Sequence, residues 1–129
     1  MSEILAGDDL LVPPDDATVN RAVEDYARAI RKSYGPRVKG IFLFGSRARG
    51  DHTRESDADI AVVLADGDWD YWDEKTRLVD LSYEVVVATG ADIQGWPVRE
   101  REWRDPARHR NPSLVNAMRR DGREIKTRP

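Results

Sequence analysis

Two short apolar runs constrain the fold of this chain most strongly: residues 38–44 (VKGIFLF) and residues 57–64 (DADIAVVL). Both have the length and the β-branched or aromatic content of buried strands. The second run carries two aspartates, Asp57 and Asp59. Side chains alternate between the faces of a strand, so both carboxylates point the same way, with Cα atoms roughly 6–7 Å apart. Packing alone gives no reason for two carboxylates on one face of a buried strand.

Helical periodicity surrounds these strands and predicts a mixed α/β fold. The predicted elements are a helix from residue 18, strands at 38–44 and 57–64, a helix at 69–89, a strand at 91–98 and a helix at 112–120. This order, αββαβα, predicts a small mixed β-sheet with helices packed on it. We expect an extended lead-in at residues 1–17, which contains Pro13-Pro14, and a single domain at 18–129.

The predicted helix at 69–89 rests on an apolar stripe at helical spacing: Trp72, Thr76, Val79, Tyr83 and Val86. Consecutive valines at 85–87 disfavour a helix near its end, and Gly90 is a stop signal. The four tryptophans are predicted mostly at core positions of helices and strands.

Composition excludes several classes of protein. The chain has no cysteine, so it forms no disulfide and no thiolate metal site. Its 21 basic and 24 acidic residues nearly balance, which argues against strong binding to nucleic acid through bulk charge. No apolar run is long enough to span a membrane, and the acidic start of the chain lacks the pattern of a signal peptide. We therefore expect a cytoplasmic protein.

A metal and phosphate site explains the two aspartates. Neighbouring carboxylates repel each other, and Mg²⁺ relieves the repulsion while also binding substrate phosphates. Gly45, at the end of the first strand, allows close approach of a polyphosphate, and Ser46 begins a turn whose free amides favour an anion. Arg47 and Arg49 add charged donors for phosphate. This arrangement is typical of phosphoryl or nucleotidyl transfer.

The stretch GSRARGDHTRESDADIAVV, residues 45–63, resembles the signature of the DNA polymerase beta nucleotidyltransferase superfamily, in particular the minimal nucleotidyltransferases (MNT) of its antitoxin branch. The resemblance extends over roughly residues 20–125. It implies a third carboxylate on a neighbouring strand, for which Asp92 is the candidate, on a face shared with Gln94 and Trp96. It also implies ATP as substrate and two Mg²⁺ ions held by Asp57, Asp59 and Asp92. Trp96 is a candidate to pack near the nucleotide base.

The resemblance also implies a reaction: transfer of AMP from ATP to a hydroxyl group. In this family the hydroxyl most often belongs to a partner HEPN toxin, which the modification silences. Two alternatives stay open. The chain is a non-catalytic binding module that neutralises its partner by masking it, or it is a nucleotidyltransferase for a small molecule. Small-molecule enzymes of the superfamily generally need a further acceptor-binding domain, and this chain has no room for one.

Overall fold

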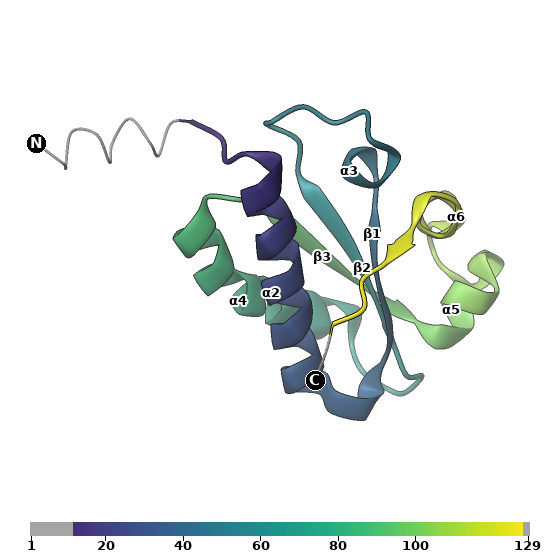
Figure 1. Cartoon of the computed structure of the whole chain (residues 1–129). Coiled ribbons are helices and arrows are strands. Elements are labelled where there is room, and N and C mark those ends of the chain that lie inside the picture. Colours follow the sequence, from purple (N-terminus) through teal and green to yellow (C-terminus); the bar gives the residue numbers. More distant parts are fainter. Residues whose placement is uncertain (1–11, 128–129) are drawn as a thin grey trace, which may run out of the picture.

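The computed structural model describes residues 12–127; residues 1–11 of the predicted lead-in and residues 128–129 lie outside the described part. Its main elements are α2 (Asp16–Tyr34), β1 (Val38–Phe44), α3 (Ser46–Arg49), β2 (Ala58–Leu64), α4 (Tyr71–Thr89), β3 (Ile93–Arg99), α5 (Glu100–Arg104), α6 (Pro112–Asp121) and β4 (Arg123–Glu124). Short 3₁₀ turns, η1 (Gly35–Arg37) and η2 (Pro106–Arg108), join neighbouring elements. This order confirms the predicted mixed α/β class (Figure 1).

The four described strands form one mixed sheet in the order β3-β2-β1-β4. The β1 strand pairs antiparallel with both β2 and β4, whereas β2 pairs parallel with β3. Parallel pairing aligns the starts of β2 and β3, with Ala58 opposite Ile93 and Asp59 opposite Gln94. The residues that precede these two strands therefore meet at one end of the sheet, and this meeting point positions the candidate site.

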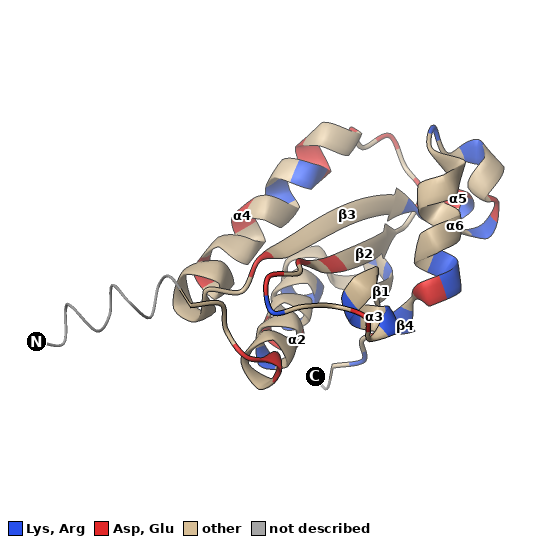
Figure 2. Cartoon of the chain, turned by 90° about the horizontal axis from the view of Figure 1, so that it is seen from above, with Lys and Arg blue, Asp and Glu red and all other residues tan. Residues whose placement is uncertain are grey.

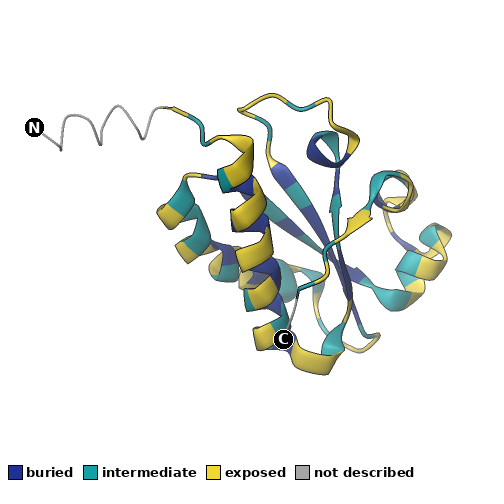
Figure 3. Cartoon of the chain, viewed as in Figure 1, coloured by how far each residue is buried: buried dark blue, intermediate teal, exposed yellow. Residues whose placement is uncertain are grey.

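Each face of the sheet is covered differently (Figures 1 and 3). Helices α2 and α4 pack on one face, where the alternate β2 residues Ala58, Ile60, Val62 and Leu64 are buried together with Tyr26 and Leu78. On the other face α5 and α6 cover a smaller cluster around Phe44, Ala61, Val98 and Met118. Asp59 lies on this second face, because it is two residues from Ala61 in the same strand.

Capping groups set the ends of the two long helices. Asp15 accepts a hydrogen bond from the backbone N–H of Thr18 at 2.8 Å, and Asp70 accepts one from Asp73 at 3.1 Å. The α4 helix ends at Gly90 in the left-handed conformation. Within residues 12–127, no helix has both the length and the apolar character needed to cross a bilayer.

Several boundaries differ from the sequence predictions. Helix α2 begins at Asp16, two residues before the predicted domain start, because Asp15 caps it. Asp57 precedes β2 rather than lying in it, and β3 begins at Ile93 rather than at residue 91. The prediction also missed α5 and β4, and it was wrong about Trp72, which is 60% exposed on α4 rather than in the core.

Candidate active site

Three aspartates meet where β2 and β3 begin. Asp57 directly precedes β2, Asp92 directly precedes β3, and Asp59 is the second residue of β2. The backbone N–H of Ala58 donates to the carbonyl of Asp92 at 2.8 Å, which fixes the two strand starts side by side. Figure 2 shows acidic segments at these adjoining strand ends. The parallel pairing thus brings the third predicted carboxylate next to the first two.

The pKa of the Asp57 carboxyl group responds to the neighbouring Asp92 and Asp59. A hydrogen bond to Asp92 raises the pKa of Asp57 to about 6; desolvation and the negative charges of Asp92 and Asp59 add to this effect, and Arg47 opposes it. Gln94 donates to Asp92 Oδ1 at 3.1 Å, so these two side chains share a face as predicted. The raised pKa of Asp57 therefore reflects a local excess of negative charge.

Asp59 is held by Trp96 from the neighbouring strand. The indole Nε1 of Trp96 donates to Asp59 Oδ1 at 3.4 Å, and the Nζ of Lys75 lies 4.0 Å from the centre of the Trp96 ring. Burial raises the pKa of Asp59, against the opposing effects of the Trp96 N–H and the Lys75 charge. Burial likewise lowers the pKa of Lys75. Sequence analysis missed Lys75, because its place on α4 gave no sign that the ammonium reaches the β3 edge.

Gly45 makes a close approach between the β1–α3 turn and Asp59. Its backbone has φ 77° and ψ −158°, a region that is open almost only to glycine. A Cβ atom at this position would lie 2.9 Å from Asp59 Oδ2. The absence of a side chain at Gly45 therefore allows the Asp59 carboxylate to lie against the backbone of this turn. Phosphate binding by Gly45 and Ser46 stays a prediction.

The two predicted phosphate-binding arginines are engaged within the protein. Arg47 is buried and donates to the carbonyls of Thr53, Arg54 and Ser56 and to the Asp16 carboxylate. It thereby ties the loop that leads into Asp57 to the start of α2. Arg49 is half-exposed and pairs with Asp51 and Asp121, each at 3.1 Å. These contacts give Arg47 a positioning role, and nucleotide contacts by Arg47 and Arg49 stay predictions.

The carboxylates suit Mg²⁺ in their chemistry. Oxygen ligands are what Mg²⁺ prefers, and a cation would relieve the repulsion that raises the pKa of Asp57. In residues 12–127, no three acidic or histidine side chains converge tightly enough to hold a metal unaided. This agrees with a site in which one or two carboxylates bind the ion and substrate phosphates complete its coordination.

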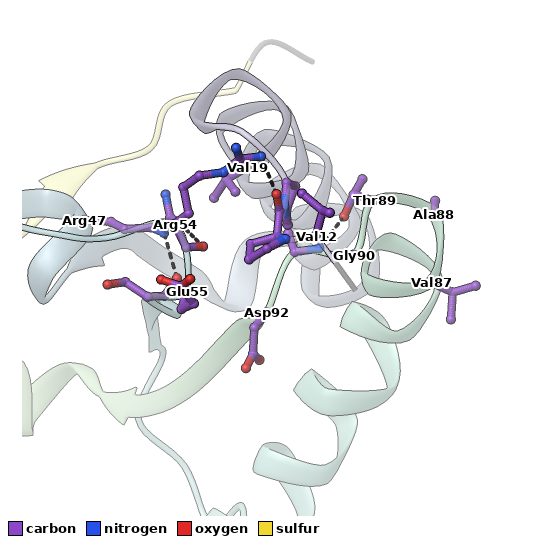
Figure 4. Close-up of a pocket in the computed structure, with 14 residues that line it drawn as sticks. Val12, Val19, Arg47, Arg54, Glu55, Val87, Ala88, Thr89, Gly90 and Asp92 are labelled. Carbon is purple, nitrogen blue, oxygen red and sulfur yellow. Dashed lines mark hydrogen bonds between the residues drawn. The ribbon is translucent and has the colours of Figure 1, made fainter. Parts of the chain in front are cut away.

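A pocket of about 430 Å³ adjoins the aspartates on the Asp92 side. Its walls come from the chain before α2, the loop before Asp57 and the end of α4, and Asp92 lies at its edge (Figure 4). The lining includes apolar groups, Val12 and Val87 among them, and the charged side chains of Arg54 and Glu55. Arg47, two residues after Gly45, also lines this pocket, whereas Gly45, Asp57 and Asp59 do not.

The sequence matches the nucleotidyltransferase domain family over residues 23–109, and the chain belongs to this family. It is 43% identical over 67 residues to a Methanocaldococcus jannaschii protein named "Putative protein adenylyltransferase MJ0604". It is 32% identical over 68 residues to a second such protein of that organism, MJ1379. The matches cover 52% and 53% of this chain and 66% of each relative, slightly under two thirds of their length.

Solved structures share the fold. A nucleotidyltransferase-like crystal structure from Sulfolobus solfataricus aligns with a TM-score of 0.57 at 20% identity and covers 87% of this chain and 86% of its own. A toxin–antitoxin complex with AMP-PNP aligns with a TM-score of 0.53 at 22% identity, covering 81% and 73%. At such identities the likeness establishes the fold alone. The match over residues 23–109 confirms the predicted nucleotidyltransferase family, and the solved structures confirm its fold.

Proposed function

We propose that this chain is a Mg²⁺-dependent adenylyltransferase that moves AMP from ATP to a hydroxyl group of a partner protein. The observation that carries the proposal is the meeting of Asp57, Asp59 and Asp92 at one end of the sheet, where the backbone N–H of Ala58 donates to the carbonyl of Asp92 at 2.8 Å. Similarity to proteins named as protein adenylyltransferases supports a protein as the acceptor.

The three aspartates are the metal ligands in this proposal. Asp57 and Asp59 would hold Mg²⁺ together with the ATP phosphates, and Asp59 and Asp92 would hold a second ion. Bound Mg²⁺ supplies stabilisation of the negative charge that develops on the phosphoryl oxygens. Gly45 and Ser46 accommodate the triphosphate on the Asp59 side, where Gly45 leaves the carboxylate accessible.

The reaction is an in-line displacement at the α-phosphorus of ATP. Asp92 accepts the proton of the acceptor hydroxyl, whose oxygen forms a bond to the α-phosphorus. The bond from that phosphorus to the bridging oxygen breaks, and pyrophosphate leaves. Asp92 suits the acceptor side because it borders a pocket that neither Gly45 nor Ser46 lines.

The acceptor we propose first is a HEPN-type toxin, for which the structural likeness to toxin–antitoxin complexes gives support at the level of fold. The test incubates the chain with a HEPN-type protein, Mg²⁺ and ATP labelled at the α-phosphate, and follows the label by electrophoresis. We expect label on the acceptor, and its loss by orders of magnitude in the Asp57→Asn/Asp59→Asn variant. If that variant protects cells from the toxin as well as the unchanged chain does, the chain acts by masking and the proposal fails.

A further inference from the structure

The outer face of α4 carries an apolar stripe that is largely exposed, with the Arg110 guanidinium 5.5 Å from the ring centre of Trp72 at its start. Trp72, Val79, Tyr83 and Val87 are 60%, 50%, 68% and 65% exposed, and Thr76 lies between them at helical spacing. The stripe extends along roughly 22 Å of helix at 1.5 Å per residue. Single exposed apolar residues are common, but a continuous row of large ones is typical of an interaction surface.

An acidic row flanks this stripe. Asp73, Asp80 and Glu84 are exposed, and each directly follows a member of the stripe, about 100° further round the helix. None of the three has an ion-pair partner within residues 12–127. The surface is therefore apolar along its centre and negatively charged along one side, which favours a positively charged partner.

The α4 stripe also leads to the candidate active site. Its last member, Val87, lines the pocket that Asp92 borders, together with the residues that end α4 (Figure 4). Asp92 lies only two residues beyond the end of α4 at Gly90. A partner that lies along α4 would thus extend directly to the acceptor side of the three aspartates.

We propose that the α4 stripe and its acidic row dock an amphipathic helix of the acceptor protein, with an apolar face flanked by Lys and Arg. That this partner is the acceptor of AMP rests on the proposed function. That a helix docks on α4 rests only on the exposure and charge of the α4 stripe and its acidic row. Charge disfavours two other occupants. In an antiparallel two-fold pair of α4 helices the acidic rows would face each other. Residues 1–11 contain Glu3, Asp8 and Asp9 and no Lys or Arg.

Two synthetic peptides of about five helical turns test this proposal. Both carry the same leucine stripe, flanked by Lys in one and by Glu in the other, and binding to the full chain is followed by fluorescence anisotropy. We expect the Lys-flanked peptide to bind at least about tenfold more tightly than the Glu-flanked one. Val79→Glu and Tyr83→Glu change exposed side chains, so both variants should fold and should each weaken that binding at least about tenfold.

A matched pair of charge reversals separates the effect of the acidic row on peptide binding from the effect of the net charge of the chain. Asp80→Lys/Glu84→Lys should abolish the preference for the Lys-flanked peptide. The control, Glu24→Lys/Asp25→Lys, makes the same change in net charge at exposed positions of α2 and should leave the preference intact. Equal effects of the two double variants, or equal binding of the two peptides, would overturn the proposal.

Two further results would assign the stripe to another occupant and also overturn the proposal. One is a wild-type dimer in sedimentation experiments that Val79→Glu separates into monomers. The other is broadening of the NMR signals of α4 backbone amides by a spin label near the N-terminus, which would show that residues 1–11 occupy the stripe. The label is attached at Ser2→Cys, which is possible because the chain has no other cysteine. Peptide binding is measured without nucleotide or metal. A failure of AMP transfer therefore counts against the proposed function and leaves the docking result standing.

Discussion

Replacement of Gly45 by alanine tests the close approach between the β1–α3 turn and Asp59. The new Cβ lies 2.9 Å from Asp59 Oδ2, and the backbone stays at φ 77° and ψ −158°, where non-glycine residues are strained by about 1–3 kcal/mol. The strain lowers the free energy of unfolding. At roughly 4 °C per kcal/mol for a domain of this size, a central value of about 2 kcal/mol lowers the Tm by about 8 °C.

The same substitution has a second, separable effect on ligand binding. Rotation of the Asp59 side chain relieves the contact with the new Cβ, but it breaks the hydrogen bond from Trp96 and moves the carboxylate away from its place beside Gly45. We therefore expect Gly45→Ala to lose most of the rise in Tm that ATP with Mg²⁺ produces in the unchanged chain by mass action.

Gly50→Ala is the matched control. Gly50 also has a positive φ, 87°, but a Cβ there meets nothing within 4 Å. We expect a loss of about 1 kcal/mol from backbone strain alone and an unchanged response to ATP with Mg²⁺. The test is a thermal melt of each variant, monitored by circular dichroism, in three conditions: ATP plus Mg²⁺, ATP plus EDTA, and no addition. A Gly45→Ala chain that unfolds within a degree of wild type, or that keeps the full response to ligand, would refute the reasoning.

Three further predictions concern the carboxylates. The pKa of Asp57, about 6, lies above its ordinary value of 3.8, so the folded metal-free protein holds this proton more tightly than the unfolded chain does. Its free energy of unfolding should therefore fall as pH rises from about 4 to about 6, and Mg²⁺-dependent ATP binding should strengthen over that range. Asp92→Asn should reduce the rate of AMP transfer, measured by label transfer, far more than the affinity for ATP, measured by titration calorimetry. Equal losses of rate and affinity would instead show that Asp92 contributes to ATP binding and has no special role on the acceptor side. Trp96→Phe removes the N–H that opposes the raised pKa of Asp59, so its binding of ATP with Mg²⁺ should shift to higher pH, whereas an unchanged pH profile would show that Trp96 only packs.

The first two strands follow from local sequence, which explains why this part of the sheet was predictable. The run at residues 38–44 becomes β1 with the predicted bounds, and β2 differs from its prediction by the single residue Asp57. Parallel pairing of β2 with β3 then places Asp92 beside Asp57, an adjacency that the pattern of apolar residues around Asp92 only suggested.

Features that depend on contacts between distant residues were not predictable in this way. Periodicity identified the α4 helix but not the direction of its stripe, and Trp72 and Val79 face outwards because a different side of the helix, including Leu78, packs in the core. The pattern of Arg47 beside Gly45 suggested a phosphate contact, yet backbone carbonyls of the following loop take up its donors. Two-residue β4 and five-residue α5 are too short to produce a periodic signal.

Paramagnetic broadening by Mn²⁺ tests the central claim most directly, because it locates the metal without requiring a known acceptor. Mn²⁺ is an oxygen-binding substitute for Mg²⁺, and the measurement follows backbone amide signals as Mn²⁺ is added with ATP. The account predicts that signals at Gly45–Ser46, Asp57–Asp59 and Ala91–Ile93 disappear first, and that the Asp57→Asn/Asp59→Asn variant abolishes this selective loss. Broadening that begins at the acidic row of α4, or that is the same in the double variant, would contradict a metal–nucleotide site at the three aspartates.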